Sequence, residues 1–511
     1  MKKKSRLFTD ILIMLGLLGC RLDYVAPQLY RVTYDPNGGS GPVPVDEGVY
    51  PKGDFVTILK PKGLINENFV FLSWNTEPDG AGTEYIPGTK AELETDLVLY
   101  AVWKEPASTR QFQAQDLTDH HWYEVSAVQL AESEHCLVFA DIAEEIPASI
   151  AEAIALEYET AIFPVITEAF GDIKDVDHNG KVILLLLDIR DGYTGNGSYF
   201  MGYFQPANMS GRNRADMLYL DANPGIPGTR EFYASLAHEL QHLINFSQTA
   251  AKTGASQDIW IDEGLATAAE YLYGGDPNHR KDYYNEDPRE SIAYGNNFFV
   301  WDGYWEDPVR AGDRYDPAAN YATAYLFFQW LRIHAGGNGI YKAIIESPYR
   351  DYRAVTSAAA RFIDPSLSDW ETLLKTWMLA NVYNEPAGLF GYHDEIRTVL
   401  HHFTQTQGRE WNFFPGEGVI SDLDENPFNP NPDSNRYIRY VGLSKTAEVS
   451  QDFPYTGDYL LTFNANSDCA GNAERGYLAG LGTSRPPVRS AKRTFSSYPI
   501  DVRFNPDGSA P

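Results

Sequence analysis

The segment between residues 229 and 270 constrains the fold of this chain more than any other. Residues 237–245 read AHELQHLIN, and residues 260–266 read WIDEGLA. Apolar residues recur at helical spacing through the first run, which predicts a helix with His238 and His242 one turn apart on one face. Two imidazoles at this spacing can reach one metal ion, so the pair predicts a metal-binding helix.

Two glutamates complete the predicted site. Zinc accepts imidazole nitrogens and carboxylate oxygens in a tetrahedral shell, and a catalytic site keeps one position for water. Glu239 follows the first histidine directly, so we predict it as the general base for this water. Glu263 opens the second periodic segment and is the leading candidate for the third ligand. On the helical face of Glu263, Thr267 and Glu270 are candidates to orient a ligand histidine.

A chance pair of solvated or core histidines is the alternative interpretation. With 11 His in 511 residues, the His-Glu-x-x-His pattern arises at random in roughly one to two per cent of such chains. A chance pair would need neither a helix around it nor the Glu-Gly-Leu-Ala segment that follows. We therefore favour the metal site.

The charge and length of the chain limit its class. The formal net charge of -29 repels nucleic-acid phosphate, so we predict no nucleic-acid binding. The 511 residues predict about two to four domains, with room for a sizeable core.

Residues 1–20 read as an export signal. A basic start precedes an apolar run from Ile11 to Gly19 that is too short to span a bilayer. The run ends in LLGC and resembles a lipobox, which would make Cys20 the lipidated first residue of the mature chain. An ordinary secretory signal cut near that point is the alternative. We expect a protein of the bacterial cell envelope, anchored to the membrane by a lipid at Cys20 and either periplasmic or surface-exposed.

Two further cysteines, Cys136 and Cys469, lie far apart in the sequence. In an oxidising compartment they could form a disulfide, provided that the fold brings them within bonding distance. Free buried thiols are the equal alternative.

Residues 29–104, which follow a tether at 21–29, predict a small module of strands. It starts with the turn-forming YDPNGG, contains WNT followed by GAGT, and ends with LYAVW. These motifs resemble the Listeria–Bacteroides (internalin B) repeat family. The resemblance implies a β-grasp-like spacer or adhesion module, and we find one copy. The predicted strands are residues 30–34, 69–74 and 97–103.

Residues 105–399 alternate between strand-like and helical patterns, which predicts an α+β domain. Thr229 can cap the metal-binding helix. An edge strand before that helix could pair with an extended substrate, and the later helices would form a lower subdomain. The predicted strands are residues 136–141, 182–189, 197–204 and 216–221, and the predicted helices outside the metal site are residues 147–170, 317–334, 340–346, 352–362 and 367–384.

Residues 400–511 return to turns and strands, which predicts a β-rich accessory region with an uncertain tail after about residue 485. Residues 437–441 and 459–463 are its predicted strands. Residues 426–435, rich in Asn and Pro, predict a connection.

The Asp-rich stretch at residues 172–181 resembles the first half of a calcium loop. Asp175, Asp177 and Asn179 alternate, and Gly180 stands at the sixth position. Leu186 rather than Glu occupies the twelfth position. A turn in which these side chains bond their own backbone is the alternative to a Ca²⁺ site.

Features between roughly residues 110 and 390 together resemble the hyicolysin-type zinc metallopeptidases, the M30 peptidase family. The resemblance implies a zincin-like, gluzincin-type domain with His238, His242 and Glu263 as zinc ligands and Glu239 as the catalytic carboxylate. The features are residues 136–141, Phe163-Pro164, Phe170-Gly171, the Asp-rich turn, Gly202-Tyr203-Phe204, and the runs at 237–245 and 260–266.

The predicted function is therefore an exported zinc endopeptidase that acts on protein or peptide substrates. The oxyanion that forms during peptide hydrolysis needs a further donor, for which Tyr321, Tyr325 and His334 are candidates. One alternative is a surface adhesin or binding lipoprotein with an inactive metallopeptidase-like fold, although the intact Glu239 argues against it. A metal-dependent hydrolase of another class, such as a glycoside hydrolase, is less favoured because no paired carboxylate motif competes with the histidine motif.

Overall fold

The chain divides after Lys104 in the computed structural model, into Met1–Lys104 and Glu105–Pro511. The predicted signal with Cys20, most of the tether, and most of the predicted connection at 426–435 lie outside the described residues. The structure describes residues 28–66, 69–105, 108–195, 199–274, 278–288, 290–293, 295, 298–301, 317–396, 399, 410–423, 427–430, 436–469, 474–477 and 503–504.

The first unit is built on a four-stranded mixed sheet with the order β2-β8-β5-β6. Trp74 is fully buried at the centre of its core, and its indole donates a hydrogen bond to the carbonyl of Leu59 (2.9 Å). The three predicted strand regions are confirmed, with the first divided in two. The strands are β1 (Leu29–Tyr30), β2 (Val32–Asp35), β3 (Tyr50–Pro51), β4 (Phe55–Thr57), β5 (Val70–Asn75), β6 (Glu84–Tyr85), β7 (Lys90–Glu92) and β8 (Leu97–Lys104).

The second unit begins with a six-stranded sheet in the order β14-β15-β12-β11-β10-β9. Its three central strands, β11, β12 and β15, are parallel, and the others are antiparallel to their neighbours. All six residues of β12 are buried, as expected for a parallel strand covered on both faces. The strands are β9 (Thr109–Gln115), β10 (Trp122–Glu132), β11 (Cys136–Asp141), β12 (Val182–Leu187), β14 (Gly202–Phe204) and β15 (Met217–Asp221).

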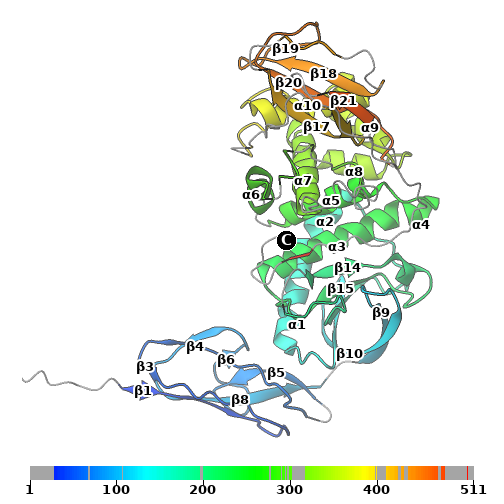
Figure 1. The fold of residues 1–511 in the computed structure, drawn as a ribbon. Helices are drawn as coiled ribbons and strands as arrows, with labels where there is room; N and C mark the ends of the chain where they lie inside the picture. Colours follow the sequence, from blue (N-terminus) through cyan, green and yellow to red (C-terminus); the bar gives the residue numbers. More distant parts are fainter. Residues whose placement is uncertain are drawn as a thin grey trace, which may run out of the picture. The chain divides into compact units, whose positions relative to one another are not determined.

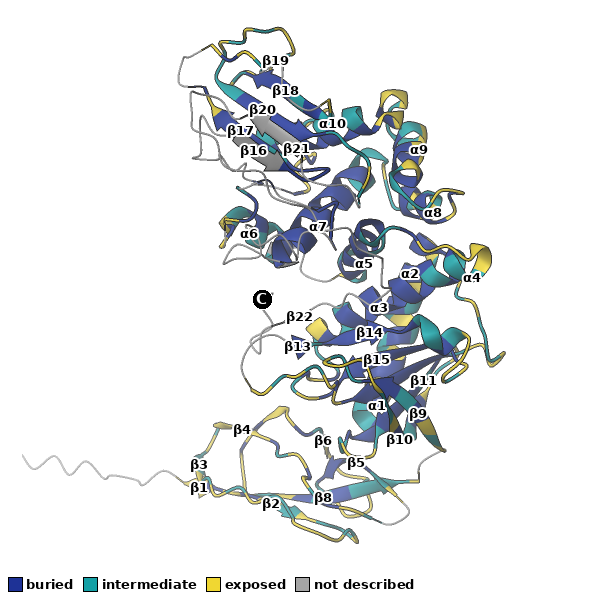
Figure 2. Cartoon of the chain, turned by 45° about the vertical axis from the view of Figure 1, so that its right-hand side comes forward, coloured by how far each residue is buried: buried dark blue, intermediate teal, exposed yellow. Residues whose placement is uncertain are grey.

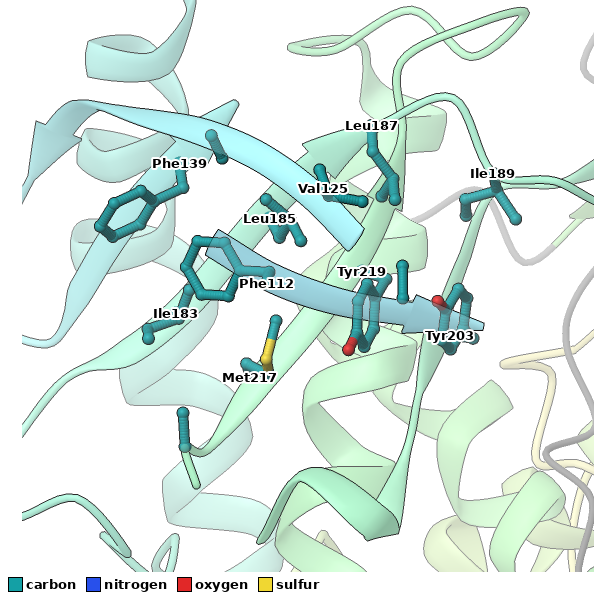
Figure 3. Packing of buried hydrophobic residues seen from close by; sticks show 13 residues of the cluster. Phe112, Val125, Phe139, Ile183, Leu185, Leu187, Ile189, Tyr203, Met217 and Tyr219 are labelled. Atoms are coloured by element: carbon teal, nitrogen blue, oxygen red, sulfur yellow. The ribbon is translucent and has the colours of Figure 1, made fainter. Parts of the chain in front are cut away.

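This sheet curls, so that β9 approaches strands at the opposite edge. The Tyr219 hydroxyl of β15 donates to the carbonyl of Gln113 in β9 (2.5 Å), although the two strands are not neighbours. The concave face encloses an apolar cluster in which the rings of Tyr203 and Tyr219 stack at 4.3 Å (Figure 3). Curling therefore buries this face without a helix over it.

Helices cover the other face. α1 (Ala148–Glu157) packs against β10 and β11, and α3 (Arg230–Gln248) packs against β14 and β15. The predicted helix at 147–170 is interrupted by a π-helical turn (Tyr158–Ile162) before α2 (Phe163–Phe170). Pro164 lacks the N–H that would bond to the carbonyl of Thr160, which explains why a regular α-helix does not continue there.

The remaining helices form layers beyond α3. α5 (Ile259–Tyr273) packs on α3, and α7 (Pro317–His334) packs on α5 (Figure 1). These three helices are mainly buried (Figure 2). The predicted helices 317–334 and 352–362 are confirmed with the same bounds, whereas the last begins at Trp370 instead of residue 367. The others are α4 (Ala250–Thr253), α6 (Asn278–Glu286), α8 (Gly339–Ile345), α9 (Tyr352–Phe362) and α10 (Trp370–Tyr383), with short 3-10 turns at Pro206–Met209 and Pro365–Ser368.

Strands return after residue 400, as predicted. A four-stranded sheet has the order β17-β20-β18-β19, and β16 pairs with β21. The predicted strand at 197–204 divides around Met201, and its first part, β13 (Tyr199–Phe200), pairs with β22 (Arg503–Phe504). Within the described residues, no helix has the combined length and apolar character that crossing a bilayer requires. The strands are β16 (Glu410–Phe413), β17 (Gly418–Asp422), β18 (Ile438–Leu443), β19 (Val449–Ser450), β20 (Tyr459–Asn464) and β21 (Glu474–Tyr477).

Candidate metal centre

Helix α3 holds the two histidines in a buried position. Thr229 caps the helix and accepts a hydrogen bond from the backbone N–H of Phe232 (3.3 Å), as predicted. The helix lies between the sheet and α5, so both of its sides are covered. His238 is fully buried, His242 is 8% exposed, and their ring centres are 4.8 Å apart.

Helix α5 brings Glu263 to the same point. Its Oε2 lies 3.5 Å from Nε2 of His238 and 3.7 Å from Nε2 of His242. These three atoms are buried and have no hydrogen-bond partner among the described residues. Ligands about 2.1 Å from a tetrahedral zinc ion lie about 3.4 Å from one another. The three donor atoms therefore fit one zinc ion.

Glu239 lies beside these donors and faces the sheet edge. Its carboxylate accepts a backbone hydrogen bond from Phe204 in β14. Burial, opposed by the neighbouring histidines, raises the pKa of Glu239 above its usual value. Gly202 of the same strand provides the space, because a Cβ there would lie 3.0 Å from Cγ of Glu239. The arrangement thus combines three donor atoms with an adjacent carboxylate whose pKa is raised.

Two carboxylates contact the Nδ1 atoms of the two histidines. Glu270 Oε1 lies 2.8 Å from Nδ1 of His238, so one of the two predicted orienting residues is in place. The other, Thr267, donates instead to the Gly264 carbonyl of its own helix (2.9 Å). Asp262, which we did not predict, lies 3.1 Å from Nδ1 of His242. Its position directly before Glu263 in the sequence was the available signal.

The carboxylates also set the charge of the imidazoles. Burial by itself lowers the pKa of His242, but Asp262 and Glu263 outweigh burial and raise it to about 10. For His238, burial lowers the pKa, and the bonds to Glu263 and Glu270 raise it above its usual value. The site therefore attracts positive charge, as a cation site must.

The predicted oxyanion donors are placed differently from one another. The Tyr321 ring centre lies 6.5 Å from that of His238, so Tyr321 borders the site. Tyr325, one turn further along α7, packs against Tyr271 at 6.4 Å. His334, at the end of the helix, bonds through Nε2 to the carbonyl of Gly391 (2.9 Å), so this nitrogen is already engaged.

The Asp-rich turn contains a second acidic group. Asp175, Asp177 and Asp216 bring carboxylate oxygens within 4.8 Å of one another, and Asp216 was not predicted. Asn179 is exposed, and its side-chain amide donates to Asp177 (2.9 Å). Asp175 accepts from the backbone N–H of Gly180 (3.0 Å). The turn thus contains the local side-chain hydrogen bonds that we expected as the alternative to a Ca²⁺ site. It also brings the carboxylates of Asp175, Asp177 and Asp216 together.

The two cysteines are free thiols. Cys136 is buried in β11, and Cys469 is partly buried. Of the two alternatives, a free buried thiol describes Cys136, whereas Cys469 is free but only partly buried.

Comparison with known proteins identifies two regions of similarity. Residues 30–102 match the family model of the Listeria-Bacteroides repeat domain. The chain is 34% identical over 257 residues to the neutral metalloprotease ShpI of Staphylococcus hyicus, which covers 48% of this chain and 56% of that protein. Over 77 residues it is 35% identical to a protein of Evansella cellulosilytica named as a Gly-rich membrane protein, which covers 15% of this chain and 9% of that protein.

The chain thus spans about half the length of the metalloprotease relative. The chain is a homologue of a neutral metalloprotease over about half its length, and it carries a Listeria–Bacteroides repeat domain at residues 30–102.

Proposed function

We propose that this chain is a zinc-dependent endopeptidase that hydrolyses peptide bonds of protein substrates. One observation carries the proposal: three buried donor atoms of His238, His242 and Glu263 converge beside Glu239, in a homologue of a neutral metalloprotease. Zinc, when bound there, acidifies a water molecule and polarises a carbonyl.

The residues of the chain have separate roles in the proposed reaction. Glu239 takes the proton of the attacking water and passes it to the leaving amine, a role suited to a buried carboxylate with a raised pKa. Tyr321 borders the site and is the better placed of the two tyrosines to donate to the developing oxyanion.

We assign residues 105–399 to a zincin-like domain of the gluzincin type. The sheet edge at β14 and the helices α3 and α5 would form the upper part, and α7 to α10 the lower part. A substrate in extended conformation would pair with the sheet edge and cross the histidines. Residues 400–511 would be the accessory region, and residues 29–104 a β-grasp-like spacer.

Export and anchoring are part of the same proposal. The sequence of residues 1–20 supports a lipoprotein signal with Cys20 as the lipidated residue, and relatives of short segments are named as membrane proteins. We place the enzyme in the bacterial cell envelope. A Ca²⁺ ion at Asp175, Asp177 and Asn179, joined by Asp216, would have a structural role in the turn before β12.

Casein cleavage and zinc content test the proposal. The wild-type chain should contain about one zinc ion and cleave casein, whereas Glu239→Gln should keep the metal and lose at least about 100-fold in rate. Glu231→Gln, an exposed glutamate on the same helix, is the matched control and should cleave as the wild type does.

The outcomes separate enzyme from adhesin. Cleavage by both the wild type and Glu239→Gln would remove Glu239 from the mechanism. Zinc binding with no cleavage by the wild type would favour the inactive, binding-protein alternative. Absence of zinc from the wild-type chain would reject the metal site itself.

A further inference from the structure

A buried arginine bonds to the carboxylate that contacts Nδ1 of His238. Arg280 belongs to α6 and is only 2% exposed. Its Nη2 lies 3.0 Å from Oε1 and 3.3 Å from Oε2 of Glu270. Neither the histidine motif nor the glutamate that follows it marks this residue in the sequence.

The contacts form one continuous series from α6 to the metal centre. Arg280 bonds to Glu270, and Oε1 of Glu270 also bonds to Nδ1 of His238. The opposite nitrogen of that imidazole, Nε2, faces Glu263. A carboxylate that accepts a hydrogen bond from Nδ1 favours the imidazole tautomer with its proton on Nδ1. Nε2 is then unprotonated and free to bind a metal.

Glu270 needs a partner to perform this role. It is a buried carboxylate, and a buried charge without a partner is strongly unfavourable. Arg280 supplies the opposite charge and leaves Oε1 directed at His238. The guanidinium is itself held against the Tyr321 ring, 5.1 Å from its centre. Helices α5, α6 and α7 thus fix one rotamer of the glutamate.

The second histidine is supported in another way. Asp262 contacts Nδ1 of His242 and accepts from the neutral side-chain amide of Asn245 (2.5 Å). The side chain of Asp262 is 36% exposed, against 8% for Glu270. The two histidines therefore differ in their supports, one in a buried ion pair and the other near solvent.

We propose that Arg280 is a positioning residue of the metal centre, which fixes Glu270 and through it the orientation and tautomer of His238. The inference rests on the proposed function to the extent that the ion is zinc. It adds that α6, which carries no ligand, determines how tightly the ion is held.

The test measures zinc affinity of the purified full-length chain by competition with a chromophoric chelator. Glu270→Gln should weaken zinc binding by about 10-fold to 100-fold, the usual effect of changing a residue that hydrogen-bonds to a metal ligand. Arg280→Met should weaken it by about 10-fold, and Arg280→Lys, which keeps the charge, should recover part of that loss.

A double variant shows whether Arg280 acts through Glu270. If the arginine acts on zinc binding only through this carboxylate, Arg280→Met combined with Glu270→Gln should bind zinc as Glu270→Gln alone does, within about threefold. In Arg280→Met the Glu270 carboxylate is left as an isolated buried charge, and the double variant removes this charge. The comparison of the double variant with Glu270→Gln therefore holds even if Arg280→Met does not fold. Weaker binding by the double variant, by tenfold or more, would overturn the proposal.

Arg332 provides a matched control. It also pairs with a carboxylate, that of Glu395, and lies 4.8 Å from a tyrosine ring centre, that of Tyr271, but it contacts neither histidine. Arg332→Met should leave zinc affinity unchanged. Equal losses of zinc affinity in Arg280→Met and Arg332→Met would show that the effect reflects only the general stability of the fold, and would reject the inference.

Failure of the inference is distinguishable from failure of the proposed function. A wild-type chain that binds no zinc rejects the function. A wild-type chain that binds zinc, with Arg280→Met binding equally well, rejects only the role of Arg280. The visible spectrum of the Co²⁺-loaded protein gives a readout of ligand geometry, and it should shift in Arg280→Met and remain unchanged in Arg332→Met.

Discussion

Two buried carboxylates of the second unit illustrate how differently single residues respond to burial. Burial raises the pKa of Glu270, but Arg280 and His238 outweigh it and lower the pKa to about 2. For Asp221, at the end of β15, burial raises the pKa to about 7 even though the backbone N–H groups of Ile189 and Gly225 bond to its oxygens. Glu270 is therefore charged at neutral pH, whereas Asp221 titrates there.

The raised pKa of Asp221 predicts a specific dependence of stability on pH. The folded chain holds this proton more tightly than the unfolded chain, so the stabilisation is complete below the usual carboxyl pKa of about 4 and is lost as the pH rises through about 7. Between pH 5 and pH 8, the wild type should lose up to about 1.4 kcal/mol per pH unit relative to Asp221→Asn. Urea unfolding of both proteins at the two pH values measures the difference.

Asp172→Asn, a change at an exposed aspartate, serves as the control and should follow the wild type. Parallel loss of stability in the wild type and Asp221→Asn would show that Asp221 does not carry the effect.

The sequence predicted most directly those residues of the candidate site whose relation is local, and it predicted Glu263 and Glu270 from their places in the next periodic segment. His238, Glu239 and His242 lie within one helical turn, so their spacing alone places them together. Asp262 and Arg280 are different, because their partners His242 and Glu270 are reached only when separate helices pack. No periodic pattern in one segment contains that information.

At the scale of elements, the site depends on the close packing of α5 on α7. A Cβ added at Gly264, next to Glu263, would lie 2.1 Å from Cε2 of Phe328 in α7. Such a separation is far below van der Waals contact, so the buried Phe328 ring or the two helices would have to shift. Helix packing thus explains the glycine that follows Glu263.

Gly264→Ala should therefore destabilise the chain by about 1–3 kcal/mol, the usual cost of overpacking a core, and weaken zinc binding because Glu263 moves with α5. Denaturant unfolding and chelator competition measure the two effects. Gly339→Ala, at the start of α8, is the control, because the nearest atom to its added Cβ lies at 3.6 Å. Equal stability of Gly264→Ala and the wild type would contradict the packing argument.

Helices with a clear apolar period were predicted well, as the bounds of α7 and α9 show. The π-helical turn before α2 was missed because periodicity gives no sign of an extra residue in a turn, although Pro164 marks the place. The strand predicted at 197–204 divides around Met201, because β13 and β14 pair with different strands. The curl of the first sheet of the second unit depends on contacts between distant strands, such as that of Tyr219 with Gln113, which no local pattern contains.

At the scale of the whole molecule, the chain consists of two units with separate cores. Trp74 anchors the first core, and the residues of the candidate metal centre all belong to the second unit. The repeat domain at residues 30–102 lies within the first unit. Recognition of zinc should thus be independent of the repeat.

A chain that begins at Glu105 should bind zinc with the affinity of the full chain, within about threefold, and its second unit should unfold within about 2 °C of the same temperature. Chelator competition and calorimetry measure these quantities. A large loss of zinc affinity on removal of residues 1–104 would show that the first unit contributes to the site.

The pairing of β13 with β22 has a consequence for the order of events on the ribosome. Residues 199–200 and 503–504 are separated by roughly 300 residues, so the earlier strand leaves the exit tunnel long before its partner exists. Both helices that carry the donor atoms emerge in that interval. The nascent protein therefore acquires its histidines and their glutamate first, and the pairing of β13 with β22 becomes possible only after residues 503–504 have emerged.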